Sequence, residues 1–491
     1  MNEGFNCDNT LIPYTPTYTA PGHASVYTGS VPSLHGIAGN FWYDRKTHRS
    51  IYCTEDDSVQ TVGSTGNAGK QSPKNLWANT ISDELRLSTN FRNKTIAIAL
   101  KDRGSILPGG HTASGVYWFD QGAGAFITST FYMNTLPPWV TAFNAQKLPD
   151  ASLKQSWKTL YPLNTYGQST ADAKPYEDVL PGEDNSFDHR TDTISAGKYT
   201  SFMYTPAANT YTFDMAKAAI KAEDLGKGVF TDLLAVSFSA TDYAGHKFGP
   251  NSIEAEDMYL RFDRDLSLFL SYLDAAIGKD QYLLFLTADH GVAHVPGFNR
   301  EHRLPGAAVD DALIGQQVND SINKRFNLTN VIENVSNYQV YLNEAVLGGA
   351  SVDRAVLKNF IIQKLLQHPG ISHAFDLSTP GNFPLPEQVK SMVVSGYSQT
   401  RGGDIQFTFK PQWFDGYNKG TTHGVWNPYD AHIPLLWYGT GIRRGKLYRE
   451  VYMTDIAPTL AALLGIQMPN AAIGKVIAEL MPVPVNKVPG R

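Results

Sequence analysis

Cysteine is scarce in this sequence, with only Cys7 and Cys53 among 491 residues. Two thiols exclude a scaffold held together by many disulfides, and they leave open either one disulfide or two buried thiols. No apolar run approaches the roughly eighteen residues that a membrane-spanning helix needs, so we expect no membrane span. The first ten residues, MNEGFNCDNT, contain neither a basic segment nor an apolar segment, so no export signal is visible there.

An excess of basic charge is also missing. The net charge of −5 provides no positive field for a phosphodiester backbone, so we expect no nucleic-acid partner. The chain is 42% hydrophobic and 18% charged, which is ordinary for a folded protein and excludes disorder throughout. Glycine and proline are plentiful, at 42 and 28 residues, so many turns and ordered loops are expected.

Three short apolar runs, each followed by polar residues, carry the main structural pattern. They are TIAIAL at 95–100, LLAVSFSA at 233–240 and YLLFLTA at 282–288. Nearly continuous apolar runs are typical of strands buried on both faces of a parallel sheet. Between the second and third runs, residues 253–277 repeat apolar side chains at helical spacing, with Ser252 as a candidate cap. The pattern predicts a strand–helix–strand unit in a doubly wound, mostly parallel α/β sheet with helices on both faces.

Two stretches fit this alternation poorly. Residues 105–205 are rich in Trp, Tyr, Pro, Asn and Gly, and residues 295–415 have a helix and strands of their own. We interpret both as insertions that cap the active-site end of the sheet. Residues 1–491 are then one catalytic α/β domain with two lids.

Aspartate and histidine follow the predicted strands in pairs. Asp242 and His246 follow one strand, Asp289 and His290 follow the next, and His423 precedes a further strand. The carboxyl ends of strands in an open α/β sheet meet where ligands bind. A single Asp or His at a strand end is usually a cap or a satisfied polar group, but two consecutive pairs favour a site for Zn²⁺, which accepts these ligands.

Other histidines compete for this role. His294 lies one helical turn beyond the second pair, and His35 and His432 lie in polar segments. We assign these three to structural or supporting positions.

Lys101 and Arg103 follow the first strand and are two residues apart, so on an extended segment they share a face. Two adjacent cations repel unless an anion lies between them, and a phosphoryl or sulfuryl group would suit both. The alternative is a solvated edge in which they pair with Asp102.

The segment TYTAPGHASVYTG at 17–29 contains a candidate nucleophile. Pro21 suits the first turn of a helix, which places Thr19 at the helix start. A hydroxyl there lies at the positive end of the helix dipole, and a bound metal can activate it. Thr15 and Thr17 fit an extended approach segment, and Thr28 falls inside the helix.

Five motifs together resemble the alkaline phosphatase superfamily, and within it the phosphate-irrepressible, PafA-type alkaline phosphatases. They occur in family order: TYTAPGHASVYTGSVPSLHGIAGNFWYD, KDRGSILPGG, SATDYAGHKFGP, LTADHGV and TTHGVWNPYDAHIPLLWYG. The resemblance spans nearly the whole chain. It implies a bacterial, periplasmic or secreted monomer that hydrolyses small phosphate monoesters with two Zn²⁺ ions.

The resemblance also implies a role for each matching residue. Thr19 would be the nucleophile that becomes phosphothreonine, and three residues would grip the phosphate oxygens: Asn40, Lys101 and Arg103. One zinc would be held by Asp242, His246 and His423, and the other by Asp289, His290 and the Thr19 oxygen. The Lys-x-Arg pair marks the monoesterase branch, because diesterase relatives offer an apolar patch instead.

One family feature is missing from the chain. Family members begin with a buried strand ending in an aspartate that ligates the zinc beside the nucleophile, and residues 1–7 look like the segment after it. We expect an N-terminal truncation, with an incomplete second zinc site as the alternative. The rival functions are a phosphodiesterase of the same superfamily and a non-catalytic phosphate-binding protein whose metal site is incomplete.

Overall fold

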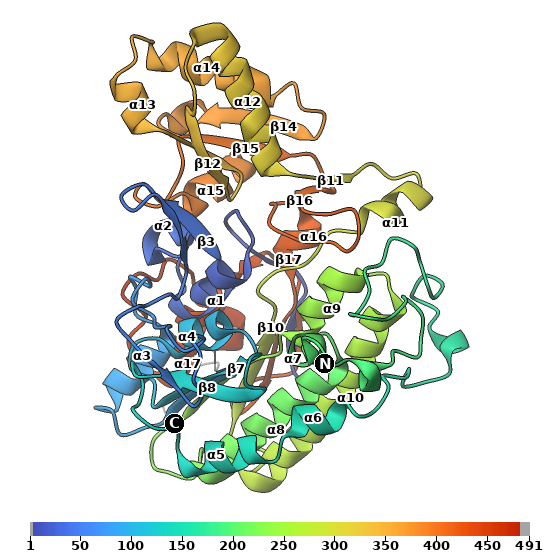
Figure 1. Ribbon diagram of the computed structural model, residues 1–491. Coiled ribbons are helices and arrows are strands. Elements are labelled where there is room, and N and C mark those ends of the chain that lie inside the picture. The colour runs from blue at the N-terminus through green and yellow to red at the C-terminus, as the bar shows by residue number, and fades with distance from the viewer. Residues whose placement is uncertain (1–2, 482–491) are drawn as a thin grey trace.

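The computed structural model (Figure 1) describes residues 3–481. The largest sheet among these residues has five strands. In spatial order these are β5 (Thr61–Val62), β8 (Ala125–Ser129), β7 (Gly115–Asp120), β6 (Thr95–Ala99) and β9 (Leu233–Ser237). β6 runs parallel to β7 and to β9, whereas β8 runs antiparallel to its neighbours β7 and β5.

A second core sheet has four strands. In spatial order these are β10 (Leu283–Thr287), β18 (Leu435–Gly439), β1 (Phe5–Cys7) and β19 (Gly445–Leu447). β10 and β1 are both antiparallel to β18. A small third sheet has the order β17 (His432–Ile433), β2 (Thr10–Leu11) and β20 (Val451–Tyr452). The apolar side chains of α17 (Ile456–Leu464) pack into the same hydrophobic core as these two sheets.

Alternating residues of β6 face two different helix layers. Ile96 and Ile98 belong to the core formed with α8 (Pro206–Ala222) and α10 (Ile253–Ala276), whereas Ala97 packs with Ile106 of α4 (Asp102–Gly109). All five residues of β6 are buried. The prediction of an α/β fold with helices on both faces of the sheet is therefore confirmed.

The predicted strand–helix–strand unit is confirmed in its helix but wrong in its pairing. α10 begins after Ser252, whose hydroxyl accepts a hydrogen bond from the Ala255 N–H at 3.1 Å. Among residues 3–481, β9 is bonded only to β6 and β10 only to β18, so the two strands lie in different sheets. The core is thus a pair of mixed sheets, because an apolar run does not reveal which neighbour a strand will choose. The predicted absence of a first strand stays a prediction.

The first predicted insertion, 105–205, is wrong in its opening part. β7 and β8 belong to the five-stranded sheet, and α4 packs against one face of β6. The remainder, 130–205, has loops and three short helices: α5 (Pro138–Ala145), α6 (Leu148–Ser152) and α7 (Lys198–Phe202). Apolar residues of this part, including Trp157 and Leu180, complete the core around α8 and α10.

The second predicted insertion, 295–415, contains a compact unit of its own at the top of Figure 1. Its antiparallel sheet has the order β12 (Ile332–Ser336), β13 (Gln339–Leu342), β15 (Ile405–Phe409) and β14 (Ile371–Asp376). The main helices of the unit are α12 (Asp311–Phe326), α14 (Arg354–Leu365) and α15 (Glu387–Gly396). β11 (Ala307–Val309) and β16 (Trp413–Asp415) run in parallel where the chain enters and leaves the unit. Its action as a lid stays a prediction.

The unit docks on the hairpin of β3 (Phe41–Asp44) and β4 (Arg49–Tyr52) and on neighbouring loops. Arg45 pairs with Asp404 at 2.9 Å. The Arg401 guanidinium lies between the rings of Trp42 and Trp77, 4.3 and 4.2 Å from their centroids. Charge pairing and cation–π contacts thus fix the unit over the amino-terminal part of the chain.

Both cysteines are free and buried, and burial raises the pKa of each thiol to about 12. Of the two alternatives for these residues, the structure therefore has buried thiols. Across residues 3–481, no helix combines the length and apolarity needed to cross a membrane.

Candidate active site

Thr19 is the first residue of α1 (Thr19–Thr28), as predicted from Pro21, and its side chain is buried. Tyr18 before it is extended, so the chain turns into the helix at the threonine. The Thr19 Oγ1 lies 3.2 Å from His290 Nε2. The hydroxyl therefore lies at the positive end of a helix with an imidazole acceptor beside it.

Asp242, His246 and His423 come together, as predicted for a metal site. Asp242 lies in the first turn of α9 (Ala240–Phe248), and His246 lies one turn later on the same face. One ligand atom from each of the three residues lies within 4.8 Å of the others. Asp242 Oδ1 is 3.3 Å from His246 Nε2 and 4.0 Å from His423 Nε2.

Asp289 and His290 form a second group directly beside the first. Asp289 Oδ2 lies 3.3 Å from His290 Nε2, and that nitrogen lies 3.8 Å from Asp242 Oδ1. The His290 and His423 rings stack with centroids 3.3 Å apart. Ligands about 2.0–2.1 Å from a tetrahedral Zn²⁺ are spaced by a little over 3 Å, and the 3.3 Å separations of Asp242 from His246 and of Asp289 from His290 match that spacing.

The backbone fixes the tautomer of all three imidazoles. Each Nδ1 contacts a carbonyl oxygen: His246 that of Thr421 at 2.8 Å, His423 that of Thr17 at 2.7 Å, and His290 that of Gly291 at 2.9 Å. Because a carbonyl can only accept, each Nδ1 donates in its contact, so in the neutral ring Nε2 is the nitrogen that presents a lone pair to the centre. This arrangement is typical of histidine metal ligands.

Asn40 lies beside the helix start. Its Oδ1 accepts a hydrogen bond from the Ala20 N–H at 2.9 Å. This contact orients the amide so that the Nδ2 group remains available to another acceptor next to Thr19.

Lys101 and Arg103 reach the same region, but not from an extended strand end as predicted. Lys101 caps α4, and Arg103 lies in the first turn of that helix. The Lys101 side chain is 6% exposed, its Nζ donates to Asp242, and it lies 4.7 Å from the Tyr243 ring centroid. The alternative of a solvated edge is therefore wrong.

Arg103 has few partners of its own. Its Nη1 donates to the Tyr52 hydroxyl at 2.9 Å, while its buried Nε has no partner within the described residues. An unsatisfied guanidinium N–H inside a protein is suited to an anionic ligand.

The charges at the site shift its pKa values in opposite directions. Burial disfavours the ionised form of Asp242, but His246 and Lys101 outweigh this effect and hold its pKa well below the usual range. Burial, reinforced by His290 and His246, lowers the pKa of His423 well below its usual value. A carboxylate and a neutral imidazole are the forms that bind a metal ion.

His23, one turn after Thr19 on α1, also belongs to the site and is not predicted from the sequence. Its Nε2 is 3.3 Å from Ser237 Oγ at the end of β9 and 3.7 Å from Asp289 Oδ2 beyond β10. Burial lowers the pKa of His23 to about 4, and Asp289 opposes this shift. The only signal was its i+4 spacing from Thr19.

Tyr52 and Asp430 were also missed. The fully buried Asp430 carboxylate accepts hydrogen bonds from the Gly424 and Val425 N–H groups, each at 2.9 Å, and so holds the loop that carries His423. Neither residue has a motif that separates it from an ordinary polar position.

The three histidines assigned to supporting positions have local partners. His35 contacts Ser25 Oγ at 3.0 Å, His294 contacts Asn251 Oδ1 at 2.7 Å, and His432 contacts the Asp8 carbonyl at 3.0 Å.

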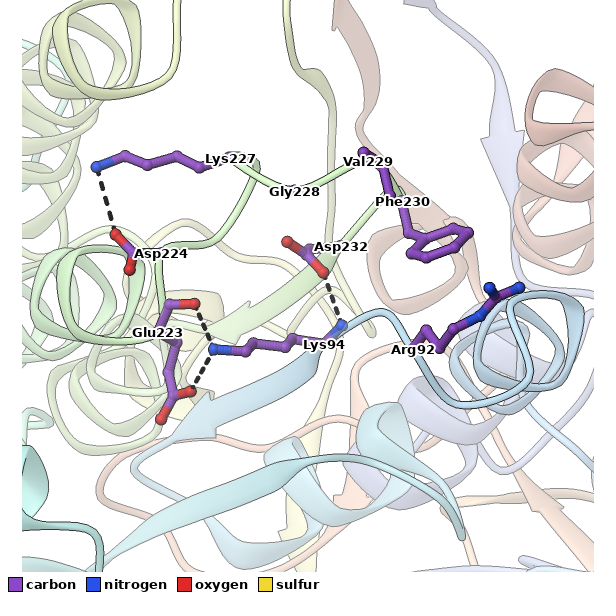
Figure 2. Close-up of a pocket in the computed structure, with 9 residues that line it drawn as sticks. All are labelled: Arg92, Lys94, Glu223, Asp224, Lys227, Gly228, Val229, Phe230 and Asp232. Atoms are coloured by element: carbon purple, nitrogen blue, oxygen red, sulfur yellow. Dashed lines mark hydrogen bonds and ion pairs between the residues drawn. The ribbon is translucent and has the colours of Figure 1, made fainter.

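A cavity of about 450 Å³ lies away from this site, where β6 and β9 begin (Figure 2). Four of its charged residues form two ion pairs: Lys94 Nζ with Glu223 at 3.0 Å, and Lys227 with Asp224 at 3.5 Å. The cavity contributes none of the residues described above.

Similarity to known proteins agrees with this geometry. The model of the type I phosphodiesterase/nucleotide pyrophosphatase family matches residues 1–430. The chain is 50% identical to alkaline phosphatase PhoV of Synechococcus elongatus, over 98% of this chain and 87% of that protein. It is 47% identical to a Myroides odoratus protein named calcium-transporting ATPase, over 98% and 88% of the two chains.

A third relative is alkaline phosphatase PafA of Elizabethkingia meningoseptica, 44% identical over 98% of this chain and 89% of that protein. The crystal structure of wild-type alkaline phosphatase PafA matches with a TM-score of 0.95, covering 98% of this chain and 93% of that one. Identity at this level over nearly the full length shows the family and the reaction. The chain belongs to the type I phosphodiesterase/nucleotide pyrophosphatase family and, within it, is an enzyme of the alkaline phosphatase kind that hydrolyses phosphate monoesters.

Proposed function

We propose that this enzyme hydrolyses phosphate monoesters through a phosphothreonine at Thr19, with two Zn²⁺ ions as cofactors. The single observation that carries the proposal is the position of His290 Nε2, which lies 3.2 Å from the Thr19 hydroxyl at the start of α1, 3.3 Å from Asp289 and 3.8 Å from Asp242. We also propose that the enzyme is a monomer and that it is periplasmic or secreted, and the family resemblance supports both points.

The donor set fits two zinc ions. Asp242, His246 and His423 would hold one, and Asp289, His290 and Thr19 the other. Two such ions would stabilise charge on the attacking and leaving oxygens of an in-line displacement. No described cysteine lies in this cluster, so the ligands are the nitrogen and oxygen donors of a catalytic site.

The side chains would divide the reaction between them. The Thr19 oxygen attacks phosphorus, the bond to the ester oxygen breaks, and the alcohol leaves with a proton. Water then attacks the phosphothreonine, releases inorganic phosphate and restores the threonine hydroxyl. Lys101, Arg103 and the Asn40 amide would hold the non-bridging oxygens, which carry most of the charge of a phosphoryl group.

The monoester preference is tested by replacing Lys101 and Arg103 with alanine, singly and together. We expect kcat/KM for p-nitrophenyl phosphate to fall by roughly 10²–10³ for each residue, because each would contact charge that the transition state concentrates. A diester has one negative charge less, so turnover of bis-p-nitrophenyl phosphate should fall much less. Equal losses for both substrates, or a wild-type enzyme faster on the diester, would favour a phosphodiesterase.

The covalent step is tested separately. Enzyme mixed with p-nitrophenyl phosphate and quenched in acid should carry one added phosphoryl group on the peptide containing Thr19, detected by mass spectrometry. If wild type shows no such adduct and Thr19→Ala still hydrolyses p-nitrophenyl phosphate, Thr19 is not the nucleophile. Tight phosphate binding without turnover would instead identify a non-catalytic phosphate-binding protein.

A further inference from the structure

The β3–β4 hairpin connects Asn40, which we propose to bind phosphate, with Tyr52, which contacts the proposed phosphate-binding residue Arg103. Asn40 directly precedes β3, and Tyr52 ends β4. Phe41 and Tyr52 are cross-strand partners whose ring centroids lie 4.9 Å apart, and Phe41 is 49% exposed. The hairpin therefore sets the distance between the Asn40 amide and the hydrogen-bond partners of the Tyr52 hydroxyl.

The Tyr52 hydroxyl touches Arg103. Within residues 3–481 it accepts the only hydrogen bond that the Arg103 side chain makes, from Nη1 at 2.9 Å. A guanidinium is a planar fork with five N–H groups, so a single bond at Nη1 sets the rotation of the entire fork. The remaining donors of the fork, including the buried Nε that has no partner among the described residues, stay free for an anionic ligand.

Asp102 fixes the direction of the phenol. The Tyr52 O–H donates to Asp102 Oδ1, so the oxygen lone pairs face Arg103. The same carboxylate oxygen accepts the Arg103 backbone N–H at 2.5 Å. Burial and the Asp102 charge raise the pKa of Tyr52 well above its usual value, which keeps the phenol protonated.

We infer that Tyr52 is a positioning residue for phosphate binding: it holds the Arg103 fork in the orientation that receives the non-bridging oxygens of a monoester. Tyr52 itself does not contact the substrate. The inference rests on the proposed role of Arg103, and it adds the residue that gives Arg103 its geometry.

The test replaces one hydroxyl, in Tyr52→Phe, and compares it with Tyr43→Phe. Tyr43 lies on the same hairpin, and its hydroxyl contacts His48 Nδ1 at 3.4 Å, whereas the Tyr52 hydroxyl contacts Asp102 and Arg103. We expect Y52F to lower kcat/KM for p-nitrophenyl phosphate by roughly 10- to 100-fold, the range for a lost hydrogen bond to a charged group. The inhibition constant of inorganic phosphate should rise by a similar factor, whereas Y43F should change neither.

Two further measurements separate positioning from a general structural effect. Turnover of bis-p-nitrophenyl phosphate by Y52F should change by less than about threefold, because the diester relies less on the fork. In an Arg103→Ala background, adding Y52F should cost less than about threefold, because residues that act as one unit are not additive. The thermal unfolding midpoints of Y52F and Y43F should agree.

The outcomes also separate a failure of the inference about Tyr52 from a failure of the proposed function. If R103A loses monoester activity while Y52F matches Y43F, the inference is overturned and the proposed function stands. If Y52F loses both substrates equally, or loses another tenfold on top of R103A, Tyr52 does not act through Arg103. If R103A itself has no effect, the proposed role of Arg103 is wrong and the inference falls with it.

Discussion

At the scale of single residues, Thr17 and Thr19 lie two positions apart and have different neighbours. Thr19 Oγ1 faces His290, whereas Thr17 Oγ1 donates to the Val425 carbonyl at 2.8 Å. Valine keeps the shape of threonine and removes the hydroxyl. We expect Thr19→Val to lower turnover by about 10⁴-fold or more, because it removes the proposed nucleophile.

Thr17→Val serves as the control, and it should lower the free energy of unfolding by about 1 kcal/mol while leaving turnover within a fewfold of wild type. Steady-state kinetics and urea unfolding of both variants check this pair. Comparable loss of turnover in the two variants would contradict the assignment of the nucleophile.

The same scale shows what a sequence can reveal about a site. Asp242, Asp289 and Thr19 could be predicted because each follows a strand or begins a helix, and the ends of these elements meet in an α/β fold. Tyr52 could not, because its role depends on an Arg103 contact fifty-one positions away in sequence. His23 was missed because a buried imidazole on a helix is more often a packing residue.

At the scale of elements, the unit at 310–415 is held on the core by Arg401. Its guanidinium lies between two tryptophan rings and donates to the Gly36 carbonyl and, at 2.9 Å, to the Asn75 carbonyl. We expect Arg401→Ala to lower the free energy of unfolding by about 2–3 kcal/mol. Arg354→Ala, which removes an exposed pair with Glu344, should cost about 0.5 kcal/mol or less. Urea unfolding decides the comparison, and equal stability of the two variants would show that Arg401 does not fasten the unit.

The loop at 166–190 is fastened to α10 by a buried imidazolium. His189 is fully buried between Glu183 at 3.1 Å and Glu254 at 2.9 Å. Burial opposes its charge, but the two carboxylates outweigh this effect and raise its pKa to about 9. Glu177 nearby has its pKa raised to about 8 by burial and by Glu254.

Both shifts mean that the folded protein binds more protons than the unfolded chain. The stability contributed by His189 is therefore complete below its unfolded pKa of about 6.5 and is lost as pH rises through 9. We expect a loss of up to about 3 kcal/mol between these limits. Unfolding free energies measured from pH 6 to 10 check this slope, which His189→Gln should flatten. A slope that is unchanged in this variant would assign the loss to other groups.

Element boundaries explain where prediction from sequence failed. The run that ends at Leu100 indicated an extended segment through Arg103, but α4 begins at Asp102 because Lys101 already has the extended geometry of a helix cap. The aromatic content of β7 and β8 resembles that of the loops after them and so predicts an insertion, yet nearly all of their side chains are buried in the sheet. Local patterns fixed the identity of α10 and β6, whereas the partners of each strand depend on tertiary contacts.

At the scale of the whole molecule, metal content tests the completeness of the site. We expect about two zinc ions per chain after reconstitution, measured by elemental analysis, and a thermal midpoint that falls on chelation and recovers with Zn²⁺. Asp242→Ala should lose zinc and activity together. Asp311→Ala, in a carboxylate cluster with Asp310 and Asp415, should change neither. One zinc per chain with no turnover would identify the site as incomplete.

The carbonyl contacts at His246, His290 and His423 have a consequence for how the molecule acquires its ions. Rotation of each ring and the choice of its free nitrogen are settled when the chain folds, so the entropy of ordering these side chains is part of folding. An arriving ion then finds its ligands already oriented. If the proposed ions bind here, we expect a metal-free molecule to take them up without refolding, so that metal supply would set how quickly activity returns.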